Sequence, residues 1–132
     1  MNKITSTSKP GYHGTRELEP WQKEAHHYQV TLRYDGREMQ LDYFMGKAHT
    51  KPPTTFDVVA CIVADAIGFE DSTSIFSFEE WCENIGYDTD SRRAERIYNA
   101  CMKQTAKLQV LLGENFHKIL LMEEEEIKAI CE

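Results

Sequence analysis

Two alternating segments joined by a two-residue turn dominate the first half of the sequence. In YQVTLRY, residues 28–34, large side chains alternate with polar ones, and the alternation resumes in MQLDY after the turn. Asp35-Gly36 lies between them, a pair preferred in type I′ hairpin turns. A one-residue slip would mix apolar and polar residues on both faces, so the register is well specified. The predicted cross-strand pairs are Leu32 with Met39, Val30 with Leu41, and Tyr28 with Tyr43.

A bare hairpin is marginally stable in water, so helices must cover its apolar face. Apolar spacing predicts helices over about 55–68, 78–85 and 91–112, and a fourth over the glutamate-rich C-terminal segment. Thr54 or Thr55 is placed to cap the first of them. The predicted fold class is therefore α+β, with a small antiparallel β-hairpin or three-stranded sheet packed against three to four α-helices.

The chain length of 132 residues predicts a single domain spanning 1–132. Residues 1–27 are predicted to be an irregular N-terminal segment, in which the β-prone stretch KITST at 3–7 favours an edge strand. The hairpin covers 28–46, and the helical part covers 54–131.

Residues 76–91 have the signals of a corner between two helices. Ser77 and Glu80 have capping-box spacing, Phe76 and Trp81 flank them as a hydrophobic staple, and Gly86 is a helix stop. Asp88, Asp90 or Ser91 is predicted to cap the long helix that follows.

Arg92 and Arg93 lie in the first turn of that helix, where positive charge opposes the helix dipole. Arg92, Arg96, Lys103 and Lys107 form a basic ridge opposite the apolar stripe. Such a ridge is most often a solvated face. The alternatives are pairing with the acidic C-terminal helix, and a nucleic-acid contact.

The net charge of −7 is unevenly distributed along the chain. Residues 1–53 carry +2, residues 54–113 carry −5, and residues 114–132 carry −4. An acidic helical part argues against broad binding of phosphate backbones and favours a basic partner. The run Glu123–Glu126 is either a solvated face or an acidic docking surface.

No catalytic motif is evident, and we expect no enzyme activity, cofactor or metal. The four cysteines form no C-x-x-C pair, and the histidines have no metal-ligand spacing, so His26 and His27 are interpreted as surface residues. Asp57, Cys61 and Asp65 share a helix face, but no histidine is placed to activate the thiol. The N-terminus has no apolar signal region, and these features together predict a cytoplasmic protein without membrane contact.

Several stretches together are similar to a known group of sequences: FMG at 44–46, a proline-containing connector, DVVACIVADA at 57–66, and SFEEWCENIGYDTDSRRAERIYNAC at 77–101. Over roughly residues 28–113 the chain resembles small proteins encoded by bacteriophages, prophages and plasmids, a family that brings no established activity. The resemblance implies a small accessory protein of a mobile element in the cytoplasm of a bacterial host cell. Many such proteins, anti-CRISPR and other anti-defence proteins among them, act stoichiometrically on a host machine.

The function expected from the sequence is non-enzymatic binding of a host protein or protein complex, such as a nucleic-acid-binding one, through an acidic surface. One alternative is a nucleic-acid-binding accessory factor that uses the basic ridge. Another is a small enzyme that uses Asp88 or Asp90 with a metal. The candidate partner-binding residues are Glu79, Glu80, Glu83, Asp88, Asp90, Arg92, Arg93, Glu123, Glu124, Glu125 and Glu126.

Overall fold

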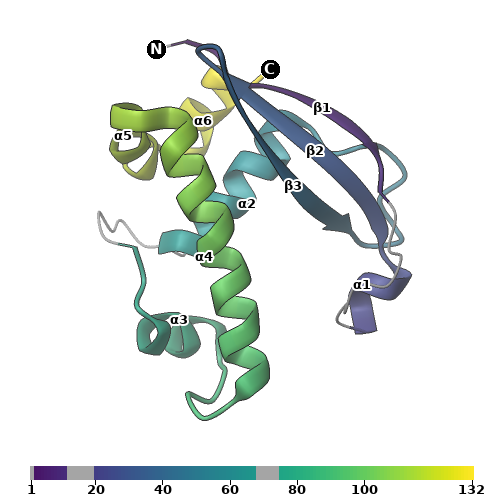
Figure 1. Ribbon diagram of the computed structural model, residues 1–132, viewed down its shortest axis with the longest axis vertical. Coiled ribbons are helices and arrows are strands. Elements are labelled where there is room, and N and C mark those ends of the chain that lie inside the picture. Colours follow the sequence, from purple (N-terminus) through teal and green to yellow (C-terminus); the bar gives the residue numbers. More distant parts are fainter. Residues whose placement is uncertain (1, 12–19, 68–74) are drawn as a thin grey trace.

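The computed structural model describes residues 2–11, 20–67 and 75–132. It has the predicted α+β class, an antiparallel sheet of strand order β1-β2-β3 with helices against one face (Figure 1). The elements are β1 (Thr5–Pro10), α1 (Pro20–Glu24), β2 (His26–Tyr34), β3 (Arg37–Met45), α2 (Thr55–Ile67), α3 (Phe78–Ile85), α4 (Arg92–Leu112), the 3₁₀ turn η1 (Gly113–Asn115), α5 (Phe116–Leu120) and α6 (Glu124–Ile130).

The hairpin has the predicted register. Val30 pairs with Leu41, Leu32 pairs with Met39, and all four side chains are buried. Asp35 and Gly36 have φ angles of 49° and 77°, which are the positive values that a type I′ turn requires. The alternation of the sequence therefore determines which face of β2 and β3 meets the helices.

The N-terminal strand is present, but it lies at Thr5–Pro10 and not at 3–7. It extends into residues that the sequence predicted to be irregular. Pro10 is compatible with this edge position, because the neighbouring amide of Gly11 bonds the His27 carbonyl and the proline nitrogen faces away from β2. α1 likewise lies inside the segment predicted to be irregular, and β2 begins at His26, two positions before the predicted start at 28.

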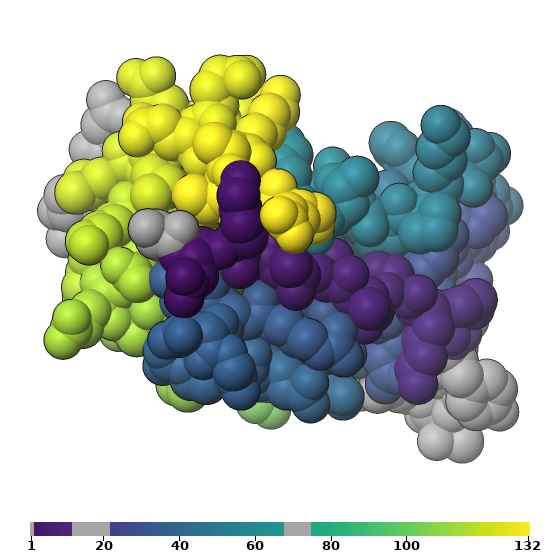
Figure 2. Space-filling view, turned by 90° about the horizontal axis from the view of Figure 1, so that it is seen from above, coloured from purple at the N-terminus to yellow at the C-terminus, as the bar shows by residue number. Residues whose placement is uncertain are grey.

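Main-chain hydrogen bonds connect the two ends of the chain. The Ile4 amide donates to the Ile130 carbonyl at 2.7 Å, and the Glu132 amide donates to the Ile4 carbonyl at 2.9 Å. Ile4 is fully buried, and Figure 2 shows the N-terminal segment in purple beside the C-terminal helix in yellow. Ile4 thus connects the sheet to α6 instead of beginning the edge strand.

α2 is the central helix, and seven of its residues are buried. Thr54 caps it: the Thr54 hydroxyl accepts from the Asp57 amide at 3.1 Å, and the Asp57 carboxylate accepts from the Thr54 amide at 3.0 Å. The buried side chains of α2 pack with those of the sheet and of the C-terminal part of α4, and this set is the main core. Its α2 members are Val58, Val59, Ile62, Val63, Ala66 and Ile67.

The C-terminal segment is not the single fourth helix that its spacing predicted. After Leu120 the chain turns, and α6 begins at Glu124. The cause is a capping box in which Glu123 and Glu126 satisfy each other's free amides, as at a new helix start. The break lets Phe116 and Ile127 both reach the main core.

Candidate functional site

α3 and the start of α4 form a corner at one end of the molecule (Figure 1). The Ser77 hydroxyl accepts from the Glu80 amide at 3.3 Å, and the Glu80 carboxylate accepts from the Ser77 amide at 3.1 Å, which is the predicted capping box. Gly86 ends α3 in the left-handed conformation, with φ of 92°. The local sequence signals therefore fix both ends of α3.

An aromatic cluster separate from the main core holds this corner together. Its buried members are Phe76, Trp81, Cys82 and Ala94, and Phe78, Tyr87, Ile97 and Tyr98 pack around them. The Trp81 ring is stacked on Tyr87, with centroids 5.5 Å apart, and meets Tyr98 edge-on at 5.6 Å. The Tyr98 hydroxyl donates to the Phe76 carbonyl at 2.7 Å, so α4 is tied directly to the start of α3.

Ser91 caps α4, and the two aspartates do not. Its hydroxyl accepts from the Ala94 amide at 3.1 Å, while the main-chain carbonyl of Asp88 accepts from the Ser91 amide at 3.1 Å. The predicted choice among Asp88, Asp90 and Ser91 is therefore decided in favour of Ser91. The carboxylates of Asp88 and Asp90 remain exposed.

We call Glu79, Glu83, Asp88 and Asp90 the corner carboxylates. All four are exposed, and within the described part of the chain none of them forms an ion pair. The sequence from 54 to 91 contains no lysine or arginine, and the cationic residues nearest to them in the sequence are Arg92 and Arg93 at the start of α4. Burial and the charges of Glu79 and Glu80 raise the pKa of Tyr98 above its usual value. Residues 76–98 contain six acidic and three basic residues, so the corner carries an excess of negative charge.

The second acidic group, Glu123–Glu126, is engaged within its own helix. Glu123 and Glu126 form the capping box, and Glu124 and Glu125 lie 3.3 Å and 3.6 Å from the Lys128 ammonium. α6 packs beyond the other end of α4 (Figure 1), and the 21 residues of that helix span about 30 Å. The structure therefore does not bring the two predicted acidic groups onto one surface.

The basic ridge of Arg92, Arg96, Lys103 and Lys107 is exposed along α4. The Lys107 ammonium donates to the Gln40 carbonyl at 3.0 Å, so this end of the ridge is bound to the edge of β3. Among the described residues, no ion pair connects the ridge to Glu123–Glu126. Arg92 and Arg93 lie next to the corner carboxylates in the sequence and are exposed.

Tyr43 and Cys101 join the helix face that carries Asp57, Cys61 and Asp65. The Cys61 sulfur lies 3.9 Å from the Asp65 carboxylate. Cys101 of α4 lies near enough to influence the pKa of the same carboxyl group. The Tyr43 hydroxyl donates to the Asp57 carbonyl at 3.4 Å. No signal in the sequence predicts this contact, because Tyr43 and Cys101 belong to other elements that are distant from α2 in the sequence.

The chemistry of this cluster is that of protonated thiols. Cys61 reaches solvent, but the protein packed around its thiol raises the pKa of Cys61 to about 12. The negative charge of Asp65 adds to this effect. The same causes raise the pKa of Cys101 to about 12. Burial also raises the pKa of Asp65. A thiolate is the reactive form of cysteine, so the arrangement does not activate a nucleophile.

His27 is buried, contrary to the interpretation of both adjacent histidines as surface residues. Its Nε2 lies 2.8 Å from the Asp42 carboxylate, and its ring is stacked on Phe44 with centroids 4.5 Å apart. A Cβ at Gly11 would lie 2.5 Å from this ring, so only glycine fits beside it. His26 is exposed, because successive residues of a strand point to opposite faces.

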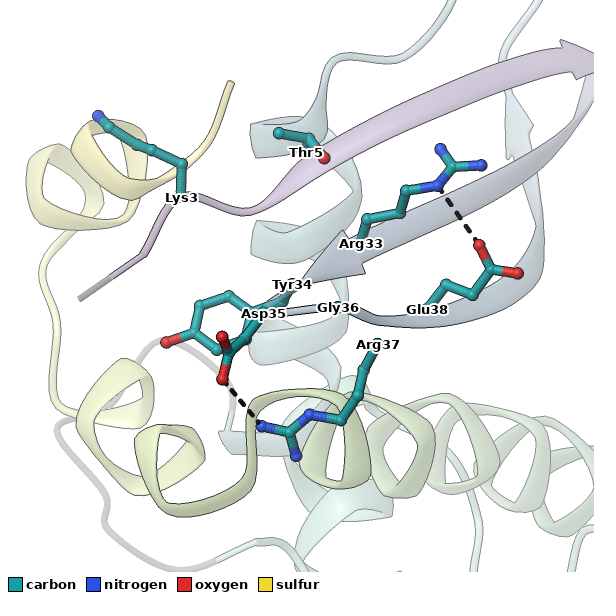
Figure 3. A pocket seen from close by; sticks show the side chains of 8 residues that line it. All are labelled: Lys3, Thr5, Arg33, Tyr34, Asp35, Gly36, Arg37 and Glu38. Carbon is teal, nitrogen blue, oxygen red and sulfur yellow. Dashed lines mark ion pairs between the residues drawn. The ribbon is translucent and has the colours of Figure 1, made fainter.

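A shallow pocket of about 330 Å³ lies at the hairpin turn, between Lys3 and the segment Arg33–Glu38 (Figure 3). Its guanidinium groups are already paired. Arg33 lies 3.3 Å from Glu38 and Arg37 lies 3.8 Å from Asp35, as the dashed lines show. An anion entering this pocket would therefore find no guanidinium group that lacks a carboxylate partner.

Across residues 2–11, 20–67 and 75–132, no group of histidine, cysteine and acidic side chains is arranged to hold a metal ion. No helix in the same ranges is long and apolar enough to cross a membrane. No family model, curated protein or solved structure matches the chain.

Proposed function

We propose that this protein is a non-enzymatic accessory protein of a bacteriophage or other mobile element, and that it binds a host protein through the α3–α4 corner. The observation that carries the proposal is the set of corner carboxylates, which are exposed and form no ion pair with any described residue. An excess of one charge on a face speeds encounter with a surface of opposite sign.

The corner is favoured over α6 because the carboxylates of α6 already have partners in their own helix. The corner also exposes half of the Ile85 side chain (50%) at the end of α3. An apolar side chain bordered by charges resembles the arrangement of many protein interfaces, which have an apolar centre and a polar rim. The partner expected from this chemistry is a basic protein surface, such as a nucleic-acid-binding groove of a host defence complex.

Binding rather than catalysis is proposed because the cysteine and carboxylate cluster holds its thiols in the protonated form. The mobile-element origin and the anti-defence role are proposed from the resemblance of residues 28–113. A nucleic-acid-binding role for the basic ridge is the alternative, and it is weakened by the engagement of Lys107 with Gln40.

The test is capture from host lysate, compared across matched charge reversals. The corner variant is Glu79→Lys with Glu83→Lys, and the control is Glu124→Lys with Glu125→Lys, which changes the net charge equally. We expect the same host protein to be captured by the wild type and by the control, and to be lost with the corner variant. Loss with neither variant, or equally with both, would contradict the proposal.

Gel-shift titration with DNA and RNA separates the alternative. If the ridge binds nucleic acid, affinity falls steeply with salt and the corner reversals strengthen it. We expect no such shift at low salt.

A further inference from the structure

At the end of α3, a half-buried aromatic ring is stacked on a fully buried one. The amides of Gly86 and Tyr87 both donate to the Cys82 carbonyl, at 2.8 and 2.9 Å, so the chain reverses directly after the helix. The Tyr87 ring is stacked on Trp81, with centroids 5.5 Å apart and ring planes 15° from parallel. Trp81 is buried, whereas Tyr87 is half-buried. Trp81 therefore covers one face of the Tyr87 ring, and part of Tyr87 remains accessible from outside.

The electrostatic surroundings of Tyr87 favour a cation. The carbonyl groups at the C-terminal end of a helix carry partial negative charge, and the last turn of α3 contains no basic residue that would offset it. Glu83 lies in that turn, and Asp88 follows Tyr87 directly. Asp90 lies in the tight turn that the Ser91 amide closes on the Asp88 carbonyl. All three carboxylates are exposed and form no ion pair within the described part of the chain, so the backbone and the side chains attract the same sign of charge.

Two groups at this end of α3 have no partner among the described residues. The first is the Tyr87 ring, because the cation that lies over an aromatic ring in these ranges is Lys128, 5.2 Å from the centre of the Phe56 ring. The second is the indole Nε1 of Trp81, which is buried and has no hydrogen-bond acceptor. Buried polar groups of folded proteins are almost always hydrogen-bonded. The aromatic face and the indole donor therefore both point to a ligand that comes from outside the chain.

We propose that the partner presents an arginine side chain to this end of α3, with its guanidinium stacked on the face of Tyr87 that Trp81 leaves open. In that position the guanidinium adds a third layer to the stack, and its N–H groups pair with the carboxylate of Glu83 or Asp88. The peptide segment that carries the arginine also brings main-chain carbonyl oxygens, which are the acceptors that the Trp81 N–H requires. This inference rests on the proposed function, because it names the chemical group by which the corner recognises a basic partner.

Arginine fits this site better than lysine for a physical reason. The guanidinium group is planar and weakly hydrated, so it stacks on a ring and pairs with a carboxylate at the same time. The lysine ammonium is a compact and strongly hydrated charge, which gains from the carboxylates but less from the ring. A cation over an exposed aromatic ring strengthens binding by about two- to fivefold. We therefore expect the carboxylates to attract both residue types, and Tyr87 to select arginine.

The test compares two fluorescently labelled peptides by anisotropy with the full chain, one of alternating glycine and arginine and one with lysine at every arginine position. The peptides have equal length and charge, and we expect the arginine peptide to bind about two- to fivefold more tightly. Tyr87→Leu is expected to remove most of this preference without changing the affinity for the lysine peptide, whereas Tyr87→Phe keeps the ring and the preference. Glu83→Gln with Asp88→Asn weakens binding of both peptides. The matched control on α6, Glu124→Gln with Glu125→Gln, changes neither affinity.

The indole proton of Trp81, identified in the NMR spectrum by its absence from Trp81→Phe, reports where the peptide binds. We expect its resonance to shift as the arginine peptide is added to the wild type. Equal affinities for the two peptides, an arginine preference that survives Tyr87→Leu, or a Trp81 resonance that does not move overturns the proposal. If it is overturned while Glu79→Lys with Glu83→Lys still loses the host protein, the proposed function stands without the arginine contact. An arginine preference with no host protein captured has the opposite meaning, since the site then exists and the proposed function fails.

Discussion

Replacing Trp81 with alanine is expected to detach the corner and leave the sheet folded. A buried tryptophan removes about 200 Å² from water, which corresponds to about 5 kcal/mol at ~25 cal/mol per Å². Trp81 is 3% exposed, and Phe76 is the other large buried member of its cluster. The substitution therefore removes the largest buried side chain of the cluster, and truncations of this kind cost about 3–5 kcal/mol.

The consequence is expected to be local because the buried side chains of the corner cluster are separate from those of the main core. Among the described residues, α4 and a hydrogen bond from the Phe76 amide to the Ala66 carbonyl at 2.9 Å connect the two. Native-state hydrogen exchange is the suitable assay, since it reports the opening free energy of each segment separately. The Gly86 amide, bonded to the Cys82 carbonyl at 2.8 Å, reports on α3, and the Leu32 amide reports on β2. A loss of 3–5 kcal/mol lowers protection at Gly86 by about a hundred- to several-thousand-fold, while Leu32 keeps most of its protection.

Leu108→Ala is the matched control. Leu108 is fully buried in the main core, and its truncation costs about 2–5 kcal/mol. We expect this variant to lower protection at Leu32, which Trp81→Ala spares. If Trp81→Ala leaves Gly86 protected, or lowers Gly86 and Leu32 equally, the corner is not an independently opening unit and the reasoning is refuted.

Three further outcomes are expected. Gly36→Val destabilises the protein by about 1–2 kcal/mol, because the φ of 77° is costly for a β-branched residue even though a side chain would meet no clash there. Gly36→Asn is tolerated, and equal urea midpoints for the two variants contradict this prediction. Ser77→Ala lowers the free energy of unfolding by about 1 kcal/mol through loss of the cap of α3, checked by urea unfolding, where an unchanged midpoint counts against the capping box. The pKa of Asp65 is raised in the folded state, so the folded protein binds the carboxyl proton more tightly than the unfolded chain does. The stability that this proton contributes is complete below the unfolded pKa and is lost as pH rises through the folded pKa. Asp65→Asn is therefore expected to gain stability relative to the wild type between acidic and neutral pH, and a constant difference in unfolding free energy across that range contradicts the shift.

The features that the sequence predicted correctly are those determined by neighbours along the chain. The alternation around Asp35-Gly36 specified the hairpin and its register, and the spacing of Ser77 and Glu80 specified the start of α3. Turn residues and caps act within a few positions, so their signals are complete in the local sequence.

The features that it missed depend on contacts between distant segments. Ile4 looked like part of an edge strand, but its amide and carbonyl bond the C-terminal residues. Cys101 lies within the helix predicted over 91–112, and only the packing of α4 on α2 brings it near Asp65. The two acidic groups looked like one surface in the charge count, yet α4 separates them. Periodicity says which face of an element is apolar, but not which element covers it.

The central claim, that the corner carboxylates guide a basic partner, is tested most directly by association kinetics against salt concentration. The captured partner is immobilised, and the wild type is compared with the Glu79→Lys/Glu83→Lys and Glu124→Lys/Glu125→Lys variants. Screening acts over about 8 Å at physiological ionic strength, so the wild type is expected to associate more slowly as salt rises. The account predicts that the corner reversals slow association at low salt and remove most of its salt dependence, with a smaller change in dissociation, while the α6 reversals leave both rates unchanged. Wild-type rates in the corner variant, with binding abolished instead by changes at Tyr87, Arg92 and Arg93, would contradict it.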